Sequence, residues 1–305
     1  MKITRYSLIA GVMASMLAAC SEPETPTPVP ATAPSSLTAN ILFVNASPDA
    51  PQLNFFINNI AAGTGLTFPN IQESYNTPQA GPLQFRAKAA SGQIGGTLGS
   101  NDVVYRAGST NNTNFTTTAG KYYTVFVTDT TTRPKPTTPA GVTDQGGLRL
   151  FPVEDIVRSA VAGKAFVRFI NLSPNAQALE LVDADTKASI LPTKIAVKNT
   201  RTNKTDTVRN AQRRPYLEIS KSVTIDNDRV STNTAAFTAI DAGSYALQII
   251  NSNVTLGTGV KPLTAPIDFT ENFEEGKLYT IFVRGLIGVG GAKEIDVELI
   301  KHPTK

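Results

Sequence analysis

The chain contains one cysteine, Cys20, and one histidine, His302, so thiol and imidazole chemistry have a single candidate residue each. Cys20 stands at the end of a short apolar segment that follows Lys2 and Arg5. Because this segment is too short to span about 30 Å of hydrocarbon, it predicts a secretory signal rather than a membrane-spanning helix. His302 lies close to the C-terminus, where we expect a frayed tail and no partner that would make it a general base.

The sequence Leu17-Ala-Ala-Cys20 resembles the lipobox of bacterial lipoproteins. The resemblance implies a signal peptide over residues 1–19, cleavage before Cys20 and acylation of the Cys20 thiol. Acylation would use the only thiol and so exclude disulfides, cysteine-based zinc sites and a cysteine nucleophile. Ser21 is compatible with sorting to the outer membrane. We therefore expect a lipid-anchored outer-membrane protein on the periplasmic or cell-surface face.

A candidate ligand loop follows the first apolar segment of the body and contains Asn45, Ser47 and Asp49. Loops at the ends of a β-sandwich often carry function. The structural alternative is that these side chains bond nearby backbone groups while the prolines end the strand and fix the turn. We favour the structural interpretation.

Other groups that could do chemistry are few. Asp183 with Asp185, and Asp226 with Asp228, offer oxygen ligands for calcium, but they lack the glycine and the distant glutamate of an EF-hand loop. Short acidic turns explain them as well, so we expect no metal site. The sequence has no nucleophile elbow, P-loop or zinc-protease motif. We predict no catalytic residues, no cofactor and no enzyme activity.

Basic residues are concentrated in one stretch. The chain has a formal net charge of +4, but outside the predicted signal segment and this stretch the net charge is about −4. The seven basic residues of the stretch are Lys194, Lys198, Arg201, Lys204, Arg209, Arg213 and Arg214. They form a candidate patch for an anionic partner such as lipopolysaccharide or an acidic polysaccharide, although a solvated hairpin or mobile loop is the interpretation we favour. A single local patch argues against nucleic acid as a partner.

Residues 20–38 begin with the acylated cysteine and contain five prolines among threonine, alanine and serine. Such a segment cannot build a core, so we predict a disordered tether that holds the folded body clear of the membrane.

The body of the chain repeats itself, because four segments recur in the same order. The pairs are Asn40–Pro51 with Phe166–Ala176, Ala80–Ala87 with Ala242–Ile249, Gly120–Val127 with Gly276–Val283, and Gly147–Phe151 with Ile295–Ile300. This pattern predicts a tandem duplication. We expect one domain over residues 39–158 and a second over 159–305, with the basic stretch inside an insertion at about 194–233.

Alternation of apolar and polar residues predicts the fold of each copy. Leu83, Phe85 and Ala87 alternate with polar residues, and so do Ile295, Val297 and Leu299. This period of two is typical of antiparallel sheets with one solvated face. We therefore predict an all-β protein of two tandem immunoglobulin-like antiparallel β-sandwiches.

Several of these motifs resemble the bacterial domain of unknown function numbered 4397. The segments that carry the resemblance are Phe43–Pro51, Gly120–Val125, Leu148–Asp155, Ala165–Pro174 and Ala242–Tyr245. The resemblance implies a secreted or lipid-anchored β protein, and it brings no settled activity and no catalytic residues. In the second copy Asn175 replaces Asp49 and Gln177 replaces Pro51, so only the first copy keeps the fuller form of the loop.

Together these features predict a non-catalytic binding or adhesion module. Its expected partners are the membrane, through the lipid anchor, and a glycan or another envelope protein. Two alternatives stay open: a structural subunit of an envelope complex and, with less support, a glycan-active hydrolase.

Overall fold

The computed structural model describes residues 37–91, 94, 102–106, 112–135, 146–191, 194–198, 205–209, 216–217, 220–225, 228–233, 237–252 and 259–305. By its contacts the chain divides into residues 1–35 and 36–305, and every described strand lies in the second unit. The predicted signal peptide, Cys20 and most of the tether lie outside the described residues and stay predictions. In the part that is described, no helix is long and apolar enough to cross a membrane.

The first half of the body, residues 37–155, is called copy one. Its strands are β1 (Asn40–Asn45), β2 (Leu53–Ile57), β3 (Ile60–Leu66), β4 (Pro82–Ala89), β5 (Asp102–Val104), β6 (Asn114–Thr116), β7 (Tyr122–Thr128) and β8 (Arg149–Asp155).

The second half, residues 164–305, is called copy two. Its elements are β9 (Lys164–Asn171), β10 (Leu179–Asp183), β11 (Lys194–Lys198), β12 (Thr205–Arg209), β13 (Ser220–Ile225), β14 (Asp228–Asn233), β15 (Thr238–Asp241), β16 (Gly243–Asn251), β17 (Ile267–Phe273), β18 (Leu278–Arg284), the 3-10 turn η2 (Gly291–Lys293) and β19 (Asp296–His302).

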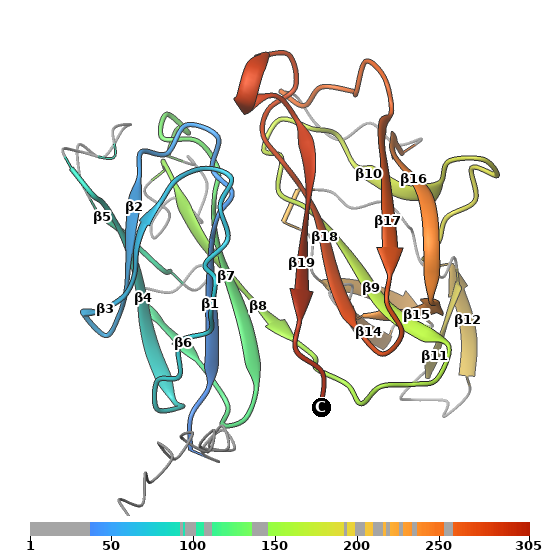
Figure 1. Cartoon of the computed structure of the whole chain (residues 1–305), viewed down its shortest axis with the longest axis horizontal. Helices are drawn as coiled ribbons and strands as arrows, with labels where there is room; N and C mark the ends of the chain where they lie inside the picture. Colours follow the sequence, from blue (N-terminus) through green and yellow to red (C-terminus); the bar gives the residue numbers. More distant parts are fainter. Residues whose placement is uncertain are drawn as a thin grey trace, which may run out of the picture. The chain divides into compact units, whose positions relative to one another are not determined.

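Each copy contains two larger sheets whose strand orders correspond, and copy two adds two hairpins (Figure 1). Copy one has β1-β7-β8 and β3-β2-β4-β5, with β6 also paired to β4. Copy two has β15-β9-β18-β19 and β10-β16-β17. The segment 71–79 of copy one lies where copy two has β15, because it forms bridges to β1 at Ile41 and Val44. The predicted all-β class is confirmed, and paired sheets in each copy agree with β-sandwiches.

One strand pair in each copy is parallel, namely β1 with β7 and β9 with β18. The prediction of antiparallel sheets is wrong for these pairs. The chain between the two partners builds the opposite sheet, and a connection of that length allows strands to run in the same direction.

Alternation correctly identifies the residues that face each core. Leu53, Phe55 and Phe85 are buried in the core of copy one, where Phe43 stacks on Phe55 at 4.7 Å between ring centroids. The intervening residues of β2 and β4 are less buried, as a half-covered sheet requires.

The prediction of one solvated face is wrong for β1, β7, β9 and β18, which are buried along almost their whole length. Their second face forms a further apolar cluster that draws on both copies. Runs such as Phe169-Ile170 are apolar at consecutive positions, which is typical of strands covered on both sides.

The insertion of copy two contains two hairpins, β11 with β12 and β13 with β14. Three residues of the predicted basic patch, Lys194, Lys198 and Arg209, lie in these strands. The side chains of all seven patch residues lie outside the described part, so the anionic-partner prediction stays a prediction.

The folded body begins slightly earlier than predicted. Thr38 forms a bridge with Gln79, and the backbone N–H of Ala80 donates to the carbonyl of Leu37 at 2.9 Å. The last two residues assigned to the tether are therefore part of the sheet edge. Between the copies, β8 ends at Asp155 and β9 begins at Lys164. The division into two domains at residues 158 and 159 stays a prediction.

Candidate functional site

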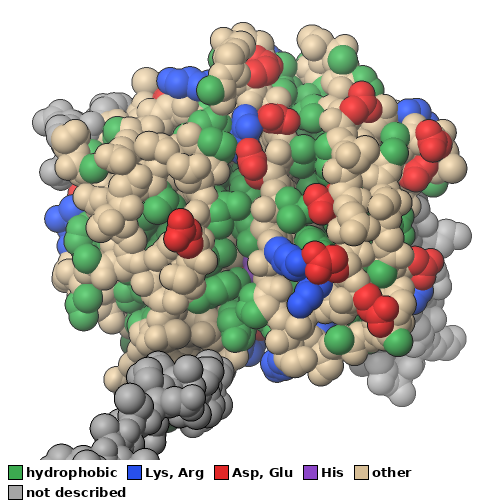
Figure 2. All heavy atoms as spheres, in the orientation of Figure 1, with side chains coloured by type: hydrophobic (Ala, Val, Ile, Leu, Met, Phe, Trp, Pro, Cys, Tyr) green, Lys and Arg blue, Asp and Glu red, His purple; other side chains and the backbone are tan. Residues whose placement is uncertain are grey.

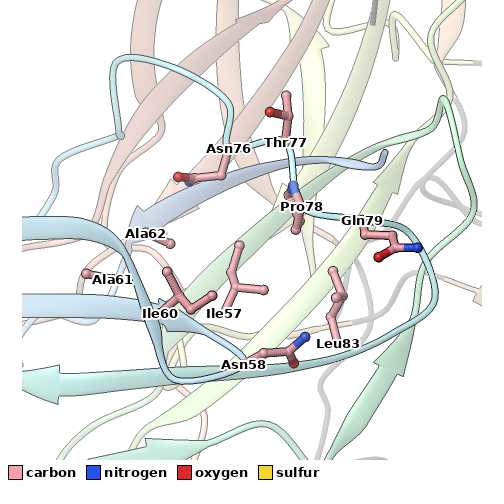
Figure 3. Close-up of a pocket in the computed structure, with 10 residues that line it drawn as sticks. All are labelled: Ile57, Asn58, Ile60, Ala61, Ala62, Asn76, Thr77, Pro78, Gln79 and Leu83. Carbon is pink, nitrogen blue, oxygen red and sulfur yellow. The ribbon is translucent and has the colours of Figure 1, made fainter. Parts of the chain in front are cut away.

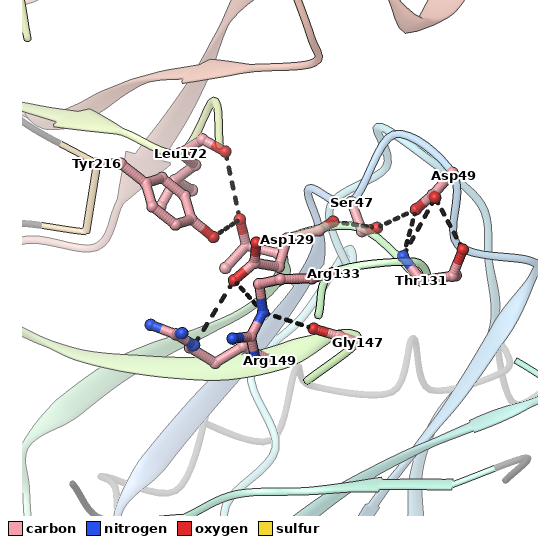
Figure 4. A network of polar contacts seen from close by, with 10 residues as sticks. Ser47, Asp49, Asp129, Thr131, Arg133, Gly147, Arg149, Leu172 and Tyr216 are labelled. Carbon is pink, nitrogen blue, oxygen red and sulfur yellow. Dashed lines mark hydrogen bonds and ion pairs between the residues drawn. The ribbon is translucent and has the colours of Figure 1, made fainter. Parts of the chain in front are cut away.

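The predicted ligand loop of copy one is held against the loop that follows β7 (Figure 4). The Ser47 hydroxyl donates to the backbone carbonyl of Asp129 at 2.7 Å, and Asn45 accepts from the Ser47 backbone N–H. The Asp49 carboxylate accepts from both the backbone N–H and the hydroxyl of Thr131. Asn45 and Ser47 are fully buried, so their polar atoms serve contacts inside the protein.

Copy two repeats this arrangement residue by residue. The Ser173 hydroxyl donates to the carbonyl of Gly285 at 2.9 Å, and Asn171 accepts from the Ser173 backbone N–H. The Asn175 side chain accepts from the backbone N–H of Ile287 and donates to its carbonyl. The repeat of the same contacts in both copies supports the structural interpretation of this loop. Its role in binding a ligand stays a prediction.

Asp129 differs from its counterpart Gly285 because it has a side chain. Its backbone is left-handed, with φ of 72°, a conformation that glycine adopts more easily. The buried Asp129 carboxylate forms ion pairs with Arg133 at 3.0 Å and Arg149 at 3.6 Å (Figure 4). Nearby, the Tyr216 hydroxyl lies 3.2 Å from that of Thr128, and burial raises the pKa of Tyr216. These contacts pair the charges with each other.

His302 is not in a frayed tail, and that prediction is wrong. It is the last residue of β19, and its side chain is fully buried. Its Nδ1 lies 2.8 Å from the Tyr75 hydroxyl and its Nε2 lies 2.6 Å from the Thr280 hydroxyl. Burial lowers the pKa of His302 to about 4; the Asp155 carboxylate at 3.6 Å opposes this shift, and the Arg168 charge adds to it. A neutral imidazole with one donor and one acceptor suits these two hydroxyls.

Among the described residues Arg168 is the largest fully buried side chain, and it is surrounded by partners. It forms an ion pair with Asp155, donates from Nε to the Thr280 hydroxyl at 2.8 Å, and donates to the carbonyl of Glu154 at 3.0 Å. Its guanidinium also lies 4.6 Å from the ring centroid of Phe237. A buried guanidinium is tolerated only when it is paired and hydrogen-bonded, as here.

These groups belong to one surface between the copies, which we call the joint. It consists of Leu42, Val44, Ala46, Tyr75, Thr124, Phe126, Val153 and Asp155 from copy one, and of Arg168, Ile170, Leu172, Phe237, Thr280, Phe282, Ile300 and His302 from copy two. The rings of Phe126 and Phe282 meet at 5.4 Å. The joint fixes the two copies to each other and is closed to solvent at its charged centre.

The strand registers make the joint a pairing of equivalent positions. Tyr122 pairs with Asp155 in copy one as Leu278 pairs with His302 in copy two, so Asp155 and His302 are counterparts. The same registers relate Phe126 to Phe282, and Leu42 to Arg168. The joint therefore resembles the isologous interface of a symmetric dimer, in which one patch meets the same patch of the other subunit.

A hollow of about 360 Å³ opens on copy one (Figure 3). It lies between the β2–β3 hairpin, at the edge of one sheet, and the segment Asn76–Gln79, at the edge of the other. Its apolar lining consists of Ile57, Ile60, Ala61, Ala62, Pro78 and Leu83. Asn58, Asn76, Thr77 and Gln79 supply the polar part.

The hollow reaches the core, because Ile57 and Leu83 at its base both belong to the buried cluster of copy one. Ile60 at the rim is 73% exposed, the largest exposure among the described large hydrophobic residues. No residue of the lining is charged. This size and this mostly apolar lining are within the range of ligand-binding pockets.

Gln72 limits the hollow on one side. Its side-chain amide donates to the carbonyl of Ala62 on β3 at 2.7 Å, and its oxygen accepts from the Asn76 side chain at 3.1 Å. These bonds tie the two sheet edges together beside the hollow.

Charged side chains on the face of the molecule shown in Figure 2 are mixed in sign. On the face shown in Figure 2, basic and acidic residues lie close together over the strands of copy two. Arg284, for example, pairs with Asp296 and Glu298, and Lys301 pairs with Glu274. Mixed charges of this kind do not attract a partner of one sign.

Asp183 caps a turn, because it accepts from the backbone N–H groups of Asp185 and Thr186. These bonds lower the pKa of Asp183. Within the described residues there is no cluster of three or more groups that could hold a metal ion. Asp226 and Asn227 lie outside the described part.

Comparison with known protein families gives a match for the region that contains the loop contacts and the hollow of copy one. Residues 39–182 match the DUF4397 family, a domain of unknown function. The resemblance read from the motifs is therefore confirmed. The DUF4397 match covers copy one with its hollow and extends to Val182 in β10 of copy two.

No curated protein matches the chain. Among solved structures, one match is the crystal structure of "a putative cell adhesion protein from Bacteroides eggerthii DSM 20697". It covers 88% of this chain and 96% of that one at 10% identity, with a TM-score of 0.18. A score this low carries no argument about fold or function.

The sequence reasoning missed the hollow in this DUF4397 region. One signal for it was present, because the repeat aligns Leu83 with the larger Tyr245 at an inward-facing position. A difference in side-chain volume at equivalent core positions indicates a place that one copy fills and the other leaves open.

Proposed function

We propose that this chain is a non-catalytic binding module of the bacterial cell envelope, attached to the outer membrane by a lipid on Cys20. The observation that carries the binding role is the uncharged hollow of copy one, which reaches the buried core and is bordered by the exposed Ile60. His302, Asp155 and Arg168 are enclosed in the joint, where Arg168 pairs with Asp155 and His302 hydrogen-bonds to Tyr75 and Thr280, which supports a structural use of these groups.

The envelope location rests on the N-terminal sequence. Lys2, Arg5, the short apolar segment and Cys20 form the pattern of a lipoprotein signal, and the proline-rich tether follows it directly. Incorporation of labelled palmitate into the wild-type chain, and its loss in Cys20→Ala, is the expected result. Palmitate incorporation that persists in Cys20→Ala would contradict the anchor.

The binding role is tested by photo-crosslinking in intact cells. A benzoylphenylalanine placed at Ile60 is expected to crosslink to a specific envelope protein or glycan. The control is the same group at Val289 of copy two, which is also exposed, at 50%. Equal labelling from both positions, or none from either, would contradict a binding site on copy one. Added protease distinguishes the two faces of the membrane, since only a surface-displayed body is digested on intact cells.

The exposed Ile60 also favours a second function, that of a structural subunit in an envelope complex. The two functions differ in the lifetime of the complex. A structural subunit co-purifies with its partner in a fixed ratio, whereas a binding module exchanges its partner during washing.

A further inference from the structure

Copy two shows what fills the equivalent of the hollow. Gly81 and Gly243 open equivalent strands, with φ of 132° and 145°, so Leu83 corresponds to Tyr245 and Gln79 to Asp241. The partly buried Tyr245 ring packs against the core cluster of copy two and lies 5.5 Å from the ring of Phe273.

The Tyr245 hydroxyl completes the contact by donating to the backbone carbonyl of Asp241 at 2.9 Å. In copy one the shorter Leu83 leaves this path empty, and both Leu83 and Gln79 line the hollow. The hollow of copy one therefore offers the space and the backbone carbonyl that correspond to those used by the Tyr245 side chain in copy two.

The neighbouring sheet edge adds backbone groups to this site. In the segment 76–80 the backbone bonds to the first strand use Asn76, Pro78 and Ala80. In an extended segment the residues between them, Thr77 and Gln79, direct their N–H and C=O to the opposite side. No backbone hydrogen bond among the described residues uses those groups. An extended peptide can pair with such an edge while a side chain enters a pocket beside it.

On this basis, and resting on the proposed binding function, we propose that the hollow of copy one receives a tyrosine side chain from an extended segment of a protein partner. Its hydroxyl donates to the carbonyl of Gln79, as that of Tyr245 donates to Asp241. The lack of charge in the lining suits this neutral side chain, since an ionised group would lose its hydration without gaining a partner.

The first test uses p-cresol, which is the side chain of tyrosine, and the chain from Ser21 to Lys305 with methyl-labelled isoleucine and alanine. Saturable shifts are expected at Ile57, Ile60 and Ala61 in NMR spectra. Toluene, which lacks the hydroxyl, is expected to bind about two- to tenfold more weakly. Equal binding of toluene, or no saturable shift with p-cresol, would overturn the inference.

Two variants exchange the residues at the equivalent positions, and their NMR spectra report folding separately from binding. Leu83→Tyr supplies the ring from the protein itself and is expected to weaken p-cresol binding at least about tenfold. The reciprocal Tyr245→Leu is expected to create a second p-cresol site in copy two while the first is kept. Unchanged binding in Leu83→Tyr, with native spectra elsewhere, would refute the proposal.

The second test uses the peptide acetyl-Thr-Val-Tyr-Val-Thr-amide and its counterpart with serine in place of tyrosine. Only the tyrosine peptide is expected to displace p-cresol. Gln79→Pro removes one edge N–H and is expected to weaken peptide binding about fivefold more than it weakens p-cresol binding. Displacement by a panel of methyl glycosides instead of the peptide would overturn the protein partner in favour of a glycan.

These results separate the inference from the function on which it rests. Crosslinking at Ile60 that is unaffected by Leu83→Tyr refutes the tyrosine site and leaves the binding module intact. Binding of p-cresol and peptide without any crosslinked partner in cells refutes the envelope binding function and leaves the chemistry of the hollow intact.

Discussion

Copy one carries Leu83 at the position where copy two carries Tyr245, although several contacts that hold the two sandwiches together are the same in both copies. Both use an asparagine and a serine to hold the first loop, and both use a tyrosine hydroxyl, of Tyr123 and Tyr279, to accept the same kind of backbone N–H at 3.0 Å. Contacts that hold the sandwich together are thus present twice, whereas the hollow is present in copy one. The difference shows that copy two places the Tyr245 side chain at this position, whereas the shorter Leu83 of copy one lines an open hollow.

The largest effect is expected in the joint. Its buried charge pair exists because copy two has Arg168 where copy one has Leu42, and Arg168 pairs with Asp155. Asp155→Ala leaves the Arg168 guanidinium buried without its carboxylate. We expect a loss of about 3–5 kcal/mol in the free energy of unfolding, measured by urea denaturation.

The control for this prediction is an exposed pair in copy two. Lys164 and Asp241 form an ion pair with side chains 42% and 79% exposed, so Lys164→Ala is expected to cost less than about 1 kcal/mol. The double variant Arg168→Leu/Asp155→Leu removes both charges and places at position 168 the leucine that copy one has at position 42. Its free energy of unfolding should remain within about 2 kcal/mol of the wild type. A single Asp155→Ala variant as stable as the control would contradict the role of the pair.

The counterparts Asp155 and His302 predict how the joint responds to pH. Burial lowers the pKa of His302 to about 4 from an unfolded value of 6.5, so the unfolded chain binds the proton first. The contribution is complete above pH 6.5 and is lost as the pH falls toward 4, by about 3 kcal/mol in total. Urea denaturation from pH 7 to pH 4 measures it.

His302→Gln isolates this effect from the carboxylates that titrate over the same range. The variant keeps hydrogen-bonding groups at this position but has no group that titrates there. We expect a shallower loss of stability between pH 6.5 and 4 than in the wild type. Parallel curves for the two proteins would show that the imidazole does not drive the pH dependence.

Exchanging the residues at the hollow sharpens the comparison of the copies directly. Tyr245→Leu removes the ring and its bond to Asp241, and we expect a loss of about 2 kcal/mol. Leu83→Tyr fills an existing space and should change the stability by less than about 1 kcal/mol. Thermal unfolding of both variants measures the difference. Equal losses would mean that the space in copy one does not fit the ring.

The smallest effect is expected at position 49, where the carboxylate of copy one corresponds to the amide of Asn175 in copy two. Asp49→Asn gives copy one the amide found at Asn175 in copy two. It replaces charge-assisted bonds to Thr131 by neutral ones, so we expect a loss of about 1 kcal/mol in urea denaturation. Asn175→Asp should not produce a matching gain, because the Asn175 amide also donates to the carbonyl of Ile287.

Local pattern was enough to predict the all-β class. Leu83, Phe85 and Ala87 alternate with polar residues and lie in the core of copy one as expected. The second buried face was not predictable in the same way, because an apolar residue such as Val44 shows no sign of what covers it.

The chemistry of the joint required contacts across long separations in sequence. His302 becomes buried only because β19 pairs with β18 and meets Tyr75, which lies 227 positions earlier. The candidate loop was read correctly as to its local bonds, but its contacts with Thr131 depend on the loop after β7. The hollow depends on the volume of Leu83 relative to its surroundings, which spacing alone does not report.

The near-symmetry of the joint has a consequence for how many partners one chain can engage. If two identical copies met at this surface, Asp155 would face another aspartate and the carboxylates would repel each other. Covalent linkage allows the counterparts to differ, so that an acid meets a histidine and an arginine takes the place of a leucine. Because the two copies can differ in sequence, copy two carries Tyr245 where copy one carries Leu83 at its hollow. One chain therefore offers the proposed tyrosine site once, and any gain in strength from multiple contacts would come from several chains acting together.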